Sequence, residues 1–249
     1  MTEQIQSEDQ IISMIKNSAH WRVVLRPGEF KRERIDRLSE LWKIVEETQV
    51  RFRGWYYPHI NYWQEGRVRG FDYIGCWCAL DRHTEYWRFY QSGQFIHLFV
   101  FVENDPEHTN ILRRNLKLDV QLSQQQLNSI SGFVDITCTI YTLTEIFEFA
   151  TRLAQRGILY PKCQIIIGMH NIMGRALSFS ESRRALNDLY IAQVKSLEKS
   201  WILVSEDLIT RKRELAIEAS LWFFERFGLE MHDSVVASIQ EELLKEGYK

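Results

Sequence analysis

The side chains best suited to binding a ligand are concentrated between Val50 and Glu103, where half of all the Phe, Trp and Tyr residues of the chain occur. Arg88 and His97 lie among them. Aromatic faces stack on planar ligands or hold peptides, while Arg and His supply polar contacts. This combination predicts a recognition surface rather than a catalytic centre.

Three segments of this region predict an antiparallel meander, namely Arg69–Leu80, Glu85–Gln91 and Gln94–Glu103. If Ser92-Gly93 is a two-residue hairpin turn, Arg88 pairs with His97, and cross-strand partners share a face. One face of the meander then carries mainly aliphatic side chains and packs on the core. The other carries a ring of aromatic residues around Arg88 and His97.

Extending the register to the first strand adds Trp77 to the row formed by Arg88 and His97. The same register places Cys76 and Cys78 on the core side. The alternative is that a helix covers the row, which would make it a second core layer with a buried, paired arginine.

Residues 51–60 form the most distinctive run of the chain. Gly54 allows a bend, and Pro58 keeps Tyr57 extended, so Trp55, Tyr57 and His59 are expected to project together. They form either a lip of the same pocket or a stiff connection packed on the sheet. The expected binding residues are Trp55, Tyr57, His59, Trp77, Tyr86, Arg88, Tyr90 and His97.

A metal site has one candidate in the sequence, which is Cys76-Trp-Cys78 together with His83. His83-Thr-Glu85 is similar to the H-x-E motif of zinc deaminases, but the P-C-x-x-C partner motif is missing. Because the register also places both cysteines in the core, the prediction is that the protein holds no metal and no cofactor.

Familiar catalytic motifs are absent from the sequence, including G-x-S-x-G, the Walker A loop and G-x-G-x-x-G. Glu145 and Glu148 are interpreted as a solvated pair rather than an acid/base couple, and His170 as a turn or edge residue. No catalytic residue is predicted, and a non-enzyme is favoured. An enzyme whose site is assembled from distant residues remains a further hypothesis.

The formal net charge of −2 provides no global basic field for non-specific nucleic-acid binding. Arginines are nevertheless concentrated before residue 70, where acidic residues interleave with them, as is typical of a solvated face. Because Trp and Tyr lie nearby, a single-stranded nucleic-acid or nucleotide-binding module using Arg88, Arg51 and Arg53 is the alternative function.

Bulk properties predict a soluble, cytoplasmic protein. The four cysteines are expected to be reduced, the N-terminus is polar and acidic, and no apolar run is long enough to span a bilayer. No membrane partner is expected, and homo-oligomer formation is left open.

The fold class expected is α/β (α+β), with flanking helices around the meander and a mainly helical C-terminal half that contains a small sheet. The polar stretch 104–122 divides an aromatic-rich α+β part (1–105) from a mostly helical α/β part (106–249), and the two could pack as one domain. Helices are expected at 7–17, 31–48, 180–198, 205–227 and 233–246, and a short one is expected from a capping box at 123–126.

Further strands are expected at 21–25, 163–170 and 201–204, with Gly174–Ser178 as a partner of 163–170. The periodicity of residues 133–153 predicts a long helix. Its first half is rich in β-branched residues, which leaves a strand there open.

Five runs of sequence are similar to those of a family of uncharacterised bacterial proteins: Trp21–Pro27, Arg53–His59, Glu85–Phe95, Thr144–Ala150 and Trp222–Gly228. The resemblance extends over nearly the whole chain and implies a complete, stand-alone protein of bacterial, cytosolic origin. It implies no activity, cofactor or catalytic residue.

The sequence therefore favours a non-catalytic binding or regulatory protein, as one component of a multi-protein bacterial system. The aromatic sheet face and residues 53–60 would hold a small ligand or a protein partner.

Overall fold

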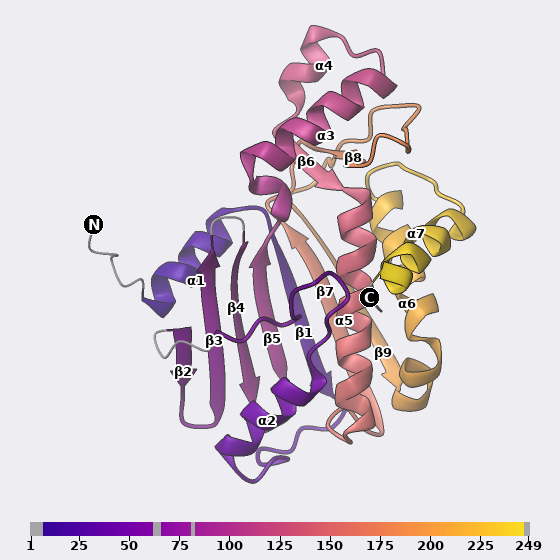
Figure 1. The fold of residues 1–249 in the computed structure, drawn as a ribbon. Coiled ribbons are helices and arrows are strands. Elements are labelled where there is room, and N and C mark those ends of the chain that lie inside the picture. The colour runs from indigo at the N-terminus through magenta and orange to yellow at the C-terminus, as the bar shows by residue number, and fades with distance from the viewer. Residues whose placement is uncertain (1–6, 62–65, 81–82, 247–249) are drawn as a thin grey trace.

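A computed structural model describes residues 7–61, 66–80 and 83–246 (Figure 1). Seven strands form one antiparallel sheet in the order β2-β3-β4-β5-β1-β7-β9. Their bounds are β1 His20–Pro27, β2 Arg67–Arg69, β3 Tyr73–Leu80, β4 His83–Tyr90, β5 Phe95–Val100, β7 Lys162–His170 and β9 Ser196–Val204. The expected α+β class, with an aromatic-rich antiparallel sheet, is confirmed.

Helices pack against both faces of this sheet. These helices are α1 Glu8–Asn17, α2 Leu38–Thr48, α5 Ile136–Gln155 and α6 Ser205–Glu225, and α7 Asp233–Glu246 packs on α5 and α6. In Figure 1, α5 runs lengthwise across the sheet and α2 lies across one end of it. Trp42 of α2 packs edge-on against Trp87, and Phe147 of α5 packs against Trp201. The face that carries α2, α5 and α6 is called the inner face below.

Helix α1 covers part of the opposite, outer face. Its Ile11 and Ile15 form a separate small core with Tyr86 and Leu98, whereas Trp87 belongs to the main core. Because consecutive strand residues point to opposite faces, Tyr86 and Trp87 cannot share a side. No helix within the described ranges is long and apolar enough to cross a lipid bilayer.

A small parallel sheet stands beyond one end of the main sheet (Figure 1). It joins β6 (Gly132–Asp135) to β8 (Arg175–Ser178), and α3 (Pro106–Asp119) packs beside it, with α4 (Gln124–Ser129) following along the chain. The prediction that Gly174–Ser178 pairs with 163–170 was therefore wrong. Asn171 and Gly174 both have positive φ, and the turn that contains them carries the chain out of the main sheet.

Two predicted helices differ from the structure. Only Leu38–Thr48 of the expected helix 31–48 is helical, because the backbone N–H groups of Arg34 and Ile35 donate to the carbonyl of Gln91 instead. The expected helix at 180–198 does not form. Two residues of that stretch bond to β8 instead, since Leu177 N–H donates to the Tyr190 carbonyl and Ala192 N–H donates to the Arg175 carbonyl. Strand β9 then begins at Ser196.

Residues 133–153 contain both elements that their sequence left open. Strand β6 ends at Asp135, whose carboxylate accepts the backbone N–H of Thr137 (2.9 Å) and caps α5. The predicted capping box at Ser123 is confirmed at the start of α4, and a second capping box, at Ser7, begins α1.

The β4–β5 hairpin has a three-residue loop rather than the predicted two-residue turn. Tyr90 N–H donates to Gln94 (2.9 Å), and Gly93 occupies the left-handed region (φ 85°), as a loop of this length requires. Arg88 consequently pairs with Ile96 instead of His97. A one-residue shift turns every side chain of β5 to the other face.

The predicted row of Trp77, Arg88 and His97 therefore does not form. Trp77 and Arg88 lie on the outer face, whereas His97 lies on the inner face opposite Trp87. Cys76 and Cys78 are buried on the inner side, as predicted.

Candidate functional site

The outer-face residues Trp77, Tyr86 and Arg88 lie where α1 packs. Glu8 of α1 accepts a hydrogen bond from Arg88 Nη2 (2.5 Å) and another from the Tyr86 hydroxyl. The Arg88 guanidinium also lies 4.6 Å from the ring centroid of Tyr73. The covering helix considered as an alternative is thus present over this part of the face, and Arg88 is paired.

Tyr90 lies on the outer face with its ring centroid 5.2 Å from that of Tyr73. It lines a surface hollow of about 410 Å³ together with Arg26, Phe30 and Gln94. The structure thus separates Tyr90 from the predicted residues of the inner face.

Residues 50–61 cross the inner face, where Trp55 and Tyr57 take opposite directions. Backbone hydrogen bonds between Val50 and Tyr57 (2.8 Å each) close the loop 51–56, in which Gly54 has positive φ. Trp55 at the loop tip is 51% exposed, whereas Tyr57 is buried with its ring centroid 5.2 Å from that of His97. The expectation that Trp55, Tyr57 and His59 project together was therefore wrong.

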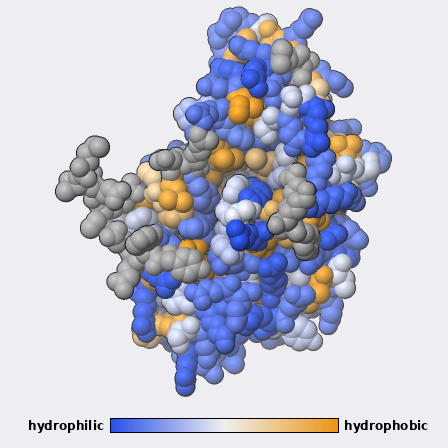
Figure 2. Space-filling view, viewed as in Figure 1, coloured by the Kyte–Doolittle hydropathy of each residue, from blue (hydrophilic) through white to orange (hydrophobic). Residues whose placement is uncertain are grey.

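His59 is positioned by its backbone. Its N–H donates to Glu85 Oε1 (2.8 Å), and its carbonyl accepts a hydrogen bond from Trp87 Nε1 (2.7 Å). These two bonds fasten residues 50–61 to β4. Figure 2 shows this side of the molecule as mainly hydrophilic, with hydrophobic residues in separate small groups.

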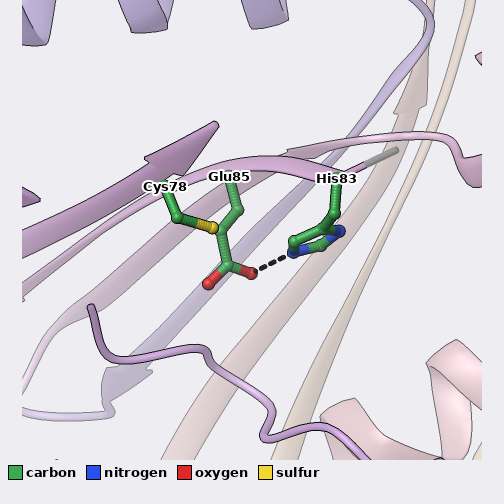
Figure 3. Close-up of side chains that lie close together, drawn as sticks. All are labelled: Cys78, His83 and Glu85. Carbon is green, nitrogen blue, oxygen red and sulfur yellow. Dashed lines mark hydrogen bonds and ion pairs between the residues drawn. The ribbon is translucent and has the colours of Figure 1, made fainter. Parts of the chain in front are cut away.

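Glu85 lies at the centre of the buried region beneath this segment. Its Oε2 lies 2.8 Å from His83 Nε2 and 3.1 Å from His97 Nε2. The ligand atoms of Cys78, His83 and Glu85 lie within 4.8 Å of one another. In Figure 3 the Cys78 sulfur and the His83 ring approach the Glu85 carboxylate from opposite sides.

The pKa directions describe the charges of this group. Burial alone would raise the pKa of Glu85, but His83 and His97 lower it overall, so the carboxyl is ionised. Burial opposes the charge on His83, yet the Glu85 carboxylate raises the pKa of His83 above its usual value. Burial lowers the pKa of His97 despite its bond to Glu85. The Glu85 carboxylate thus lies between two imidazoles, of which His83 has a raised pKa and His97 a lowered pKa.

A second ion pair closes the region on the side of α5. Arg53 Nε donates to Glu145 Oε2 (3.1 Å), Nη2 donates to the same oxygen, and Nη2 also reaches Thr142 Oγ1 (3.3 Å). Glu145 is fully buried, so its interpretation as part of a solvated pair was wrong. Burial raises the pKa of Glu145, against the effect of the Arg53 charge.

Three buried atoms here have no hydrogen-bond partner among the described residues, namely Tyr57 Oη, His97 Nδ1 and Glu145 Oε1. Burial, followed by the charges of Glu85 and Glu145, raises the pKa of Tyr57 well above its usual value. An unsatisfied buried polar atom costs about 1–3 kcal/mol, so such atoms are usually satisfied by a bound water, ion or ligand. The inner polar cluster is defined as Arg53, Tyr57, Cys78, His83, Glu85, His97 and Glu145.

Another polar group lies at the start of α5, where His108, Asp135 and Cys138 approach one another. Asp135 Oδ1 accepts backbone N–H groups of the helix, and its Oδ2 lies 3.0 Å from His108 Nε2. Glu103 accepts the N–H of Asp135 (2.7 Å). Asp135 is thus fully engaged as a helix cap, which is a structural role.

Sequence reasoning missed the pairing of Arg53 with Glu145, because 92 residues separate them and no spacing connects them. His83-Thr-Glu85 did carry a signal, since residues two apart on a strand share a face. Cys78, which lies directly across from Glu85, completes that group only through the strand pairing.

Comparisons with known proteins give this chain no relatives: no family model matches it, and neither does any curated protein or solved structure. The family resemblance drawn from the sequence therefore stays a prediction.

Proposed function

We propose that this protein is a non-catalytic binding protein whose ligand occupies the inner polar cluster rather than the outer aromatic face. The observation that supports the proposal is the presence of three unpartnered, buried polar atoms in one charged group. A bound species would supply the missing partners of Tyr57 Oη and Glu145 Oε1. Its binding would therefore offset the cost of burying them.

The surroundings favour a small, polar ligand. The cluster lies between β4, β5, α5 and residues 50–61, and both Glu85 and Glu145 are almost completely buried. Because little water reaches such a site, its charged groups interact more strongly with a polar ligand than they would at the surface. Large planar ligands suit the outer face better, but α1 covers the part around Tyr86 and Arg88 is already bound to Glu8.

The nucleic-acid alternative has less support. Arg53 and Arg88, two of its expected phosphate contacts, are engaged by Glu145 and Glu8 respectively. Phosphate binding would have to displace both carboxylates. Salt-dependent retention on single-stranded DNA would support the alternative over the proposed function.

The proposal is tested on full-length protein purified without denaturation. Native mass spectrometry measures any bound species, and analysis after denaturation identifies it. Tyr57→Phe and Glu145→Gln should lower occupancy several-fold, while Tyr90→Phe, which removes a hydroxyl from the outer face, should leave it unchanged. The proposal would be contradicted if the wild-type protein were purified without a ligand and took none up, or if all three variants showed equal occupancy.

A role within a multi-protein bacterial system stays a prediction. Co-purification from the native host tests it, because the method reports the protein partner and the ligand together. Recovery of the chain alone, with its ligand bound, would contradict the multi-protein role and leave the binding function intact.

A further inference from the structure

The donor atoms around Glu85 match the ligands of a transition-metal site. They comprise the Cys78 thiol, the His83 imidazole and the Glu85 carboxylate, whose ligand atoms lie within 4.8 Å of one another, while His97 Nε2 lies 3.1 Å from Glu85 Oε2. Zinc is bound in proteins by combinations of these donors, usually four in a tetrahedron. The pairing of β3 with β4 places Cys78 directly across from Glu85. The pairing of β4 with β5 brings His97 to the same face of the sheet.

The spacing of these donors is close to that of a coordinated ion. Ligands about 2.1 Å from a tetrahedral ion lie roughly 3.4 Å apart. His83 Nε2 and His97 Nε2 lie 2.8 and 3.1 Å from the same oxygen of Glu85. The ligand atoms of Cys78, His83 and Glu85 all lie within 4.8 Å of one another, so a small adjustment of these side chains would admit the ion.

The charge balance also suits a divalent cation. A Cys78 thiolate and the Glu85 carboxylate together neutralise two positive charges, and neutral imidazoles add none. A buried ion that is neutralised by its own ligands avoids the cost of an unpaired charge.

The ligands are held in place, and one of them is open to solvent. The N–H of His59 fixes Glu85 through Oε1, which leaves Oε2 directed at both imidazoles, and the ring of Tyr57 packs on His97. The His83 side chain is 36% exposed, while Glu85 and His97 are buried. His83 is therefore the most solvent-accessible of these side chains.

We propose that Cys78, His83 and Glu85 bind a divalent transition-metal ion, for which zinc is the best match, and that His97 positions the Glu85 ligand through its hydrogen bond. This inference rests on the proposed function, since it names the species bound at the inner polar cluster. The unpartnered oxygens of Tyr57 and Glu145 belong to the same cluster and would bind the water of the ion or a small ligand.

Zinc alone is the first probe, added to full-length protein that has been stripped with a chelator. Isothermal titration should show one ion per chain. Cobalt is the second probe, because tetrahedral Co²⁺ gives visible d–d bands and a thiolate ligand adds a near-ultraviolet charge-transfer band. Cys78→Ser should abolish that band and weaken zinc binding by at least about tenfold.

Cys76→Ser is the matched control, because Cys76 is buried on the same face of the same strand but is absent from the donor group. Its cobalt spectrum and zinc affinity should equal those of the wild type, and circular dichroism checks that both variants fold. His83→Gln, at a partly exposed position, provides a second variant that should weaken binding. No zinc uptake by the stripped wild type, or identical spectra for both cysteine variants, would overturn the inference.

The two proposals can fail separately. If zinc does not bind while Tyr57→Phe still lowers the occupancy of another ligand, the metal site is wrong and the binding function stands. If zinc binds through Cys78 while Tyr57→Phe and Glu145→Gln change nothing, the metal site stands, and the ligand-binding role of Tyr57 and Glu145 is wrong.

Discussion

Trp87 lies directly opposite His97 in the β4–β5 pair, which places the His97 imidazole on the inner face of the sheet. Arg88, one residue further along, lies on the outer face and binds Glu8 of α1. The sheet therefore separates two side chains whose types suggest a joint role. The polar chemistry of the inner face instead combines His97 with Glu85 and with residues from α5 and residues 50–61.

Two aromatic residues of the segment 50–61 should differ sharply in their contribution to stability. Tyr57→Ala removes a buried ring that packs on His97, Phe99 and Phe149, and should lower the free energy of unfolding by roughly 3–5 kcal/mol. Trp55→Ala changes an exposed ring and should cost about 0.5 kcal/mol or less. Urea denaturation measures both, and similar losses would show that the two residues do not face opposite directions.

The buried Arg53–Glu145 pair should be expensive to break from one side. Arg53→Met leaves Glu145 buried without its partner and should lower the free energy of unfolding by about 3 kcal/mol or more. Adding Glu145→Leu should recover most of this loss, because no charge then remains buried. Arg211→Met at the exposed Arg211–Glu214 pair is the control and should cost less than about 1 kcal/mol. A double variant no more stable than Arg53→Met would contradict the expectation.

Stability should fall with rising pH because of Glu103. Burial, followed by the charge of Asp135, raises the pKa of Glu103 from 4.5 to about 7. Between these values the unfolded chain has lost a proton that the folded protein retains, so this contribution is complete below pH 4.5 and is lost by pH 7. A shift of this size corresponds to about 3 kcal/mol. Urea unfolding across this range should show a decline in the wild type that Glu103→Gln largely removes, and a parallel decline in both would contradict it.

The three-residue hairpin loop should depend on Gly93. Its φ is 85°, and any other residue adopts this backbone conformation only at a cost of about 1–2 kcal/mol. A Cβ there would also lie 3.1 Å from side-chain atoms of Arg34, Ile158 and Pro27. Gly157→Ala is the control, because Gly157 also has positive φ but no atom within 4 Å of its would-be Cβ. Gly93→Ala should therefore destabilise more than Gly157→Ala in urea, and equal losses would exclude the crowding.

Local sequence signals identified most elements correctly. Ser7 and Ser123 carry capping boxes, the alternation at 163–170 marks β7, and Gly228 follows the end of α6. They failed at 180–198, where hydrogen bonds to β8 outweigh helix propensity, and at 31–37, where the backbone bonds to Gln91. Propensity is a weak preference that tertiary hydrogen bonds override.

The sequence by itself determined the α+β class, the aromatic meander and the burial of Cys76 and Cys78, because alternation and capping act over a few residues. Only the tertiary structure decided which side chains form the inner polar cluster. One residue more in the loop at Gly93 turned His97 away from Arg88 and toward Glu85. Arg53 and Glu145 meet because residues 50–61 and α5 pack on the same face, a contact between distant segments that no local pattern encodes.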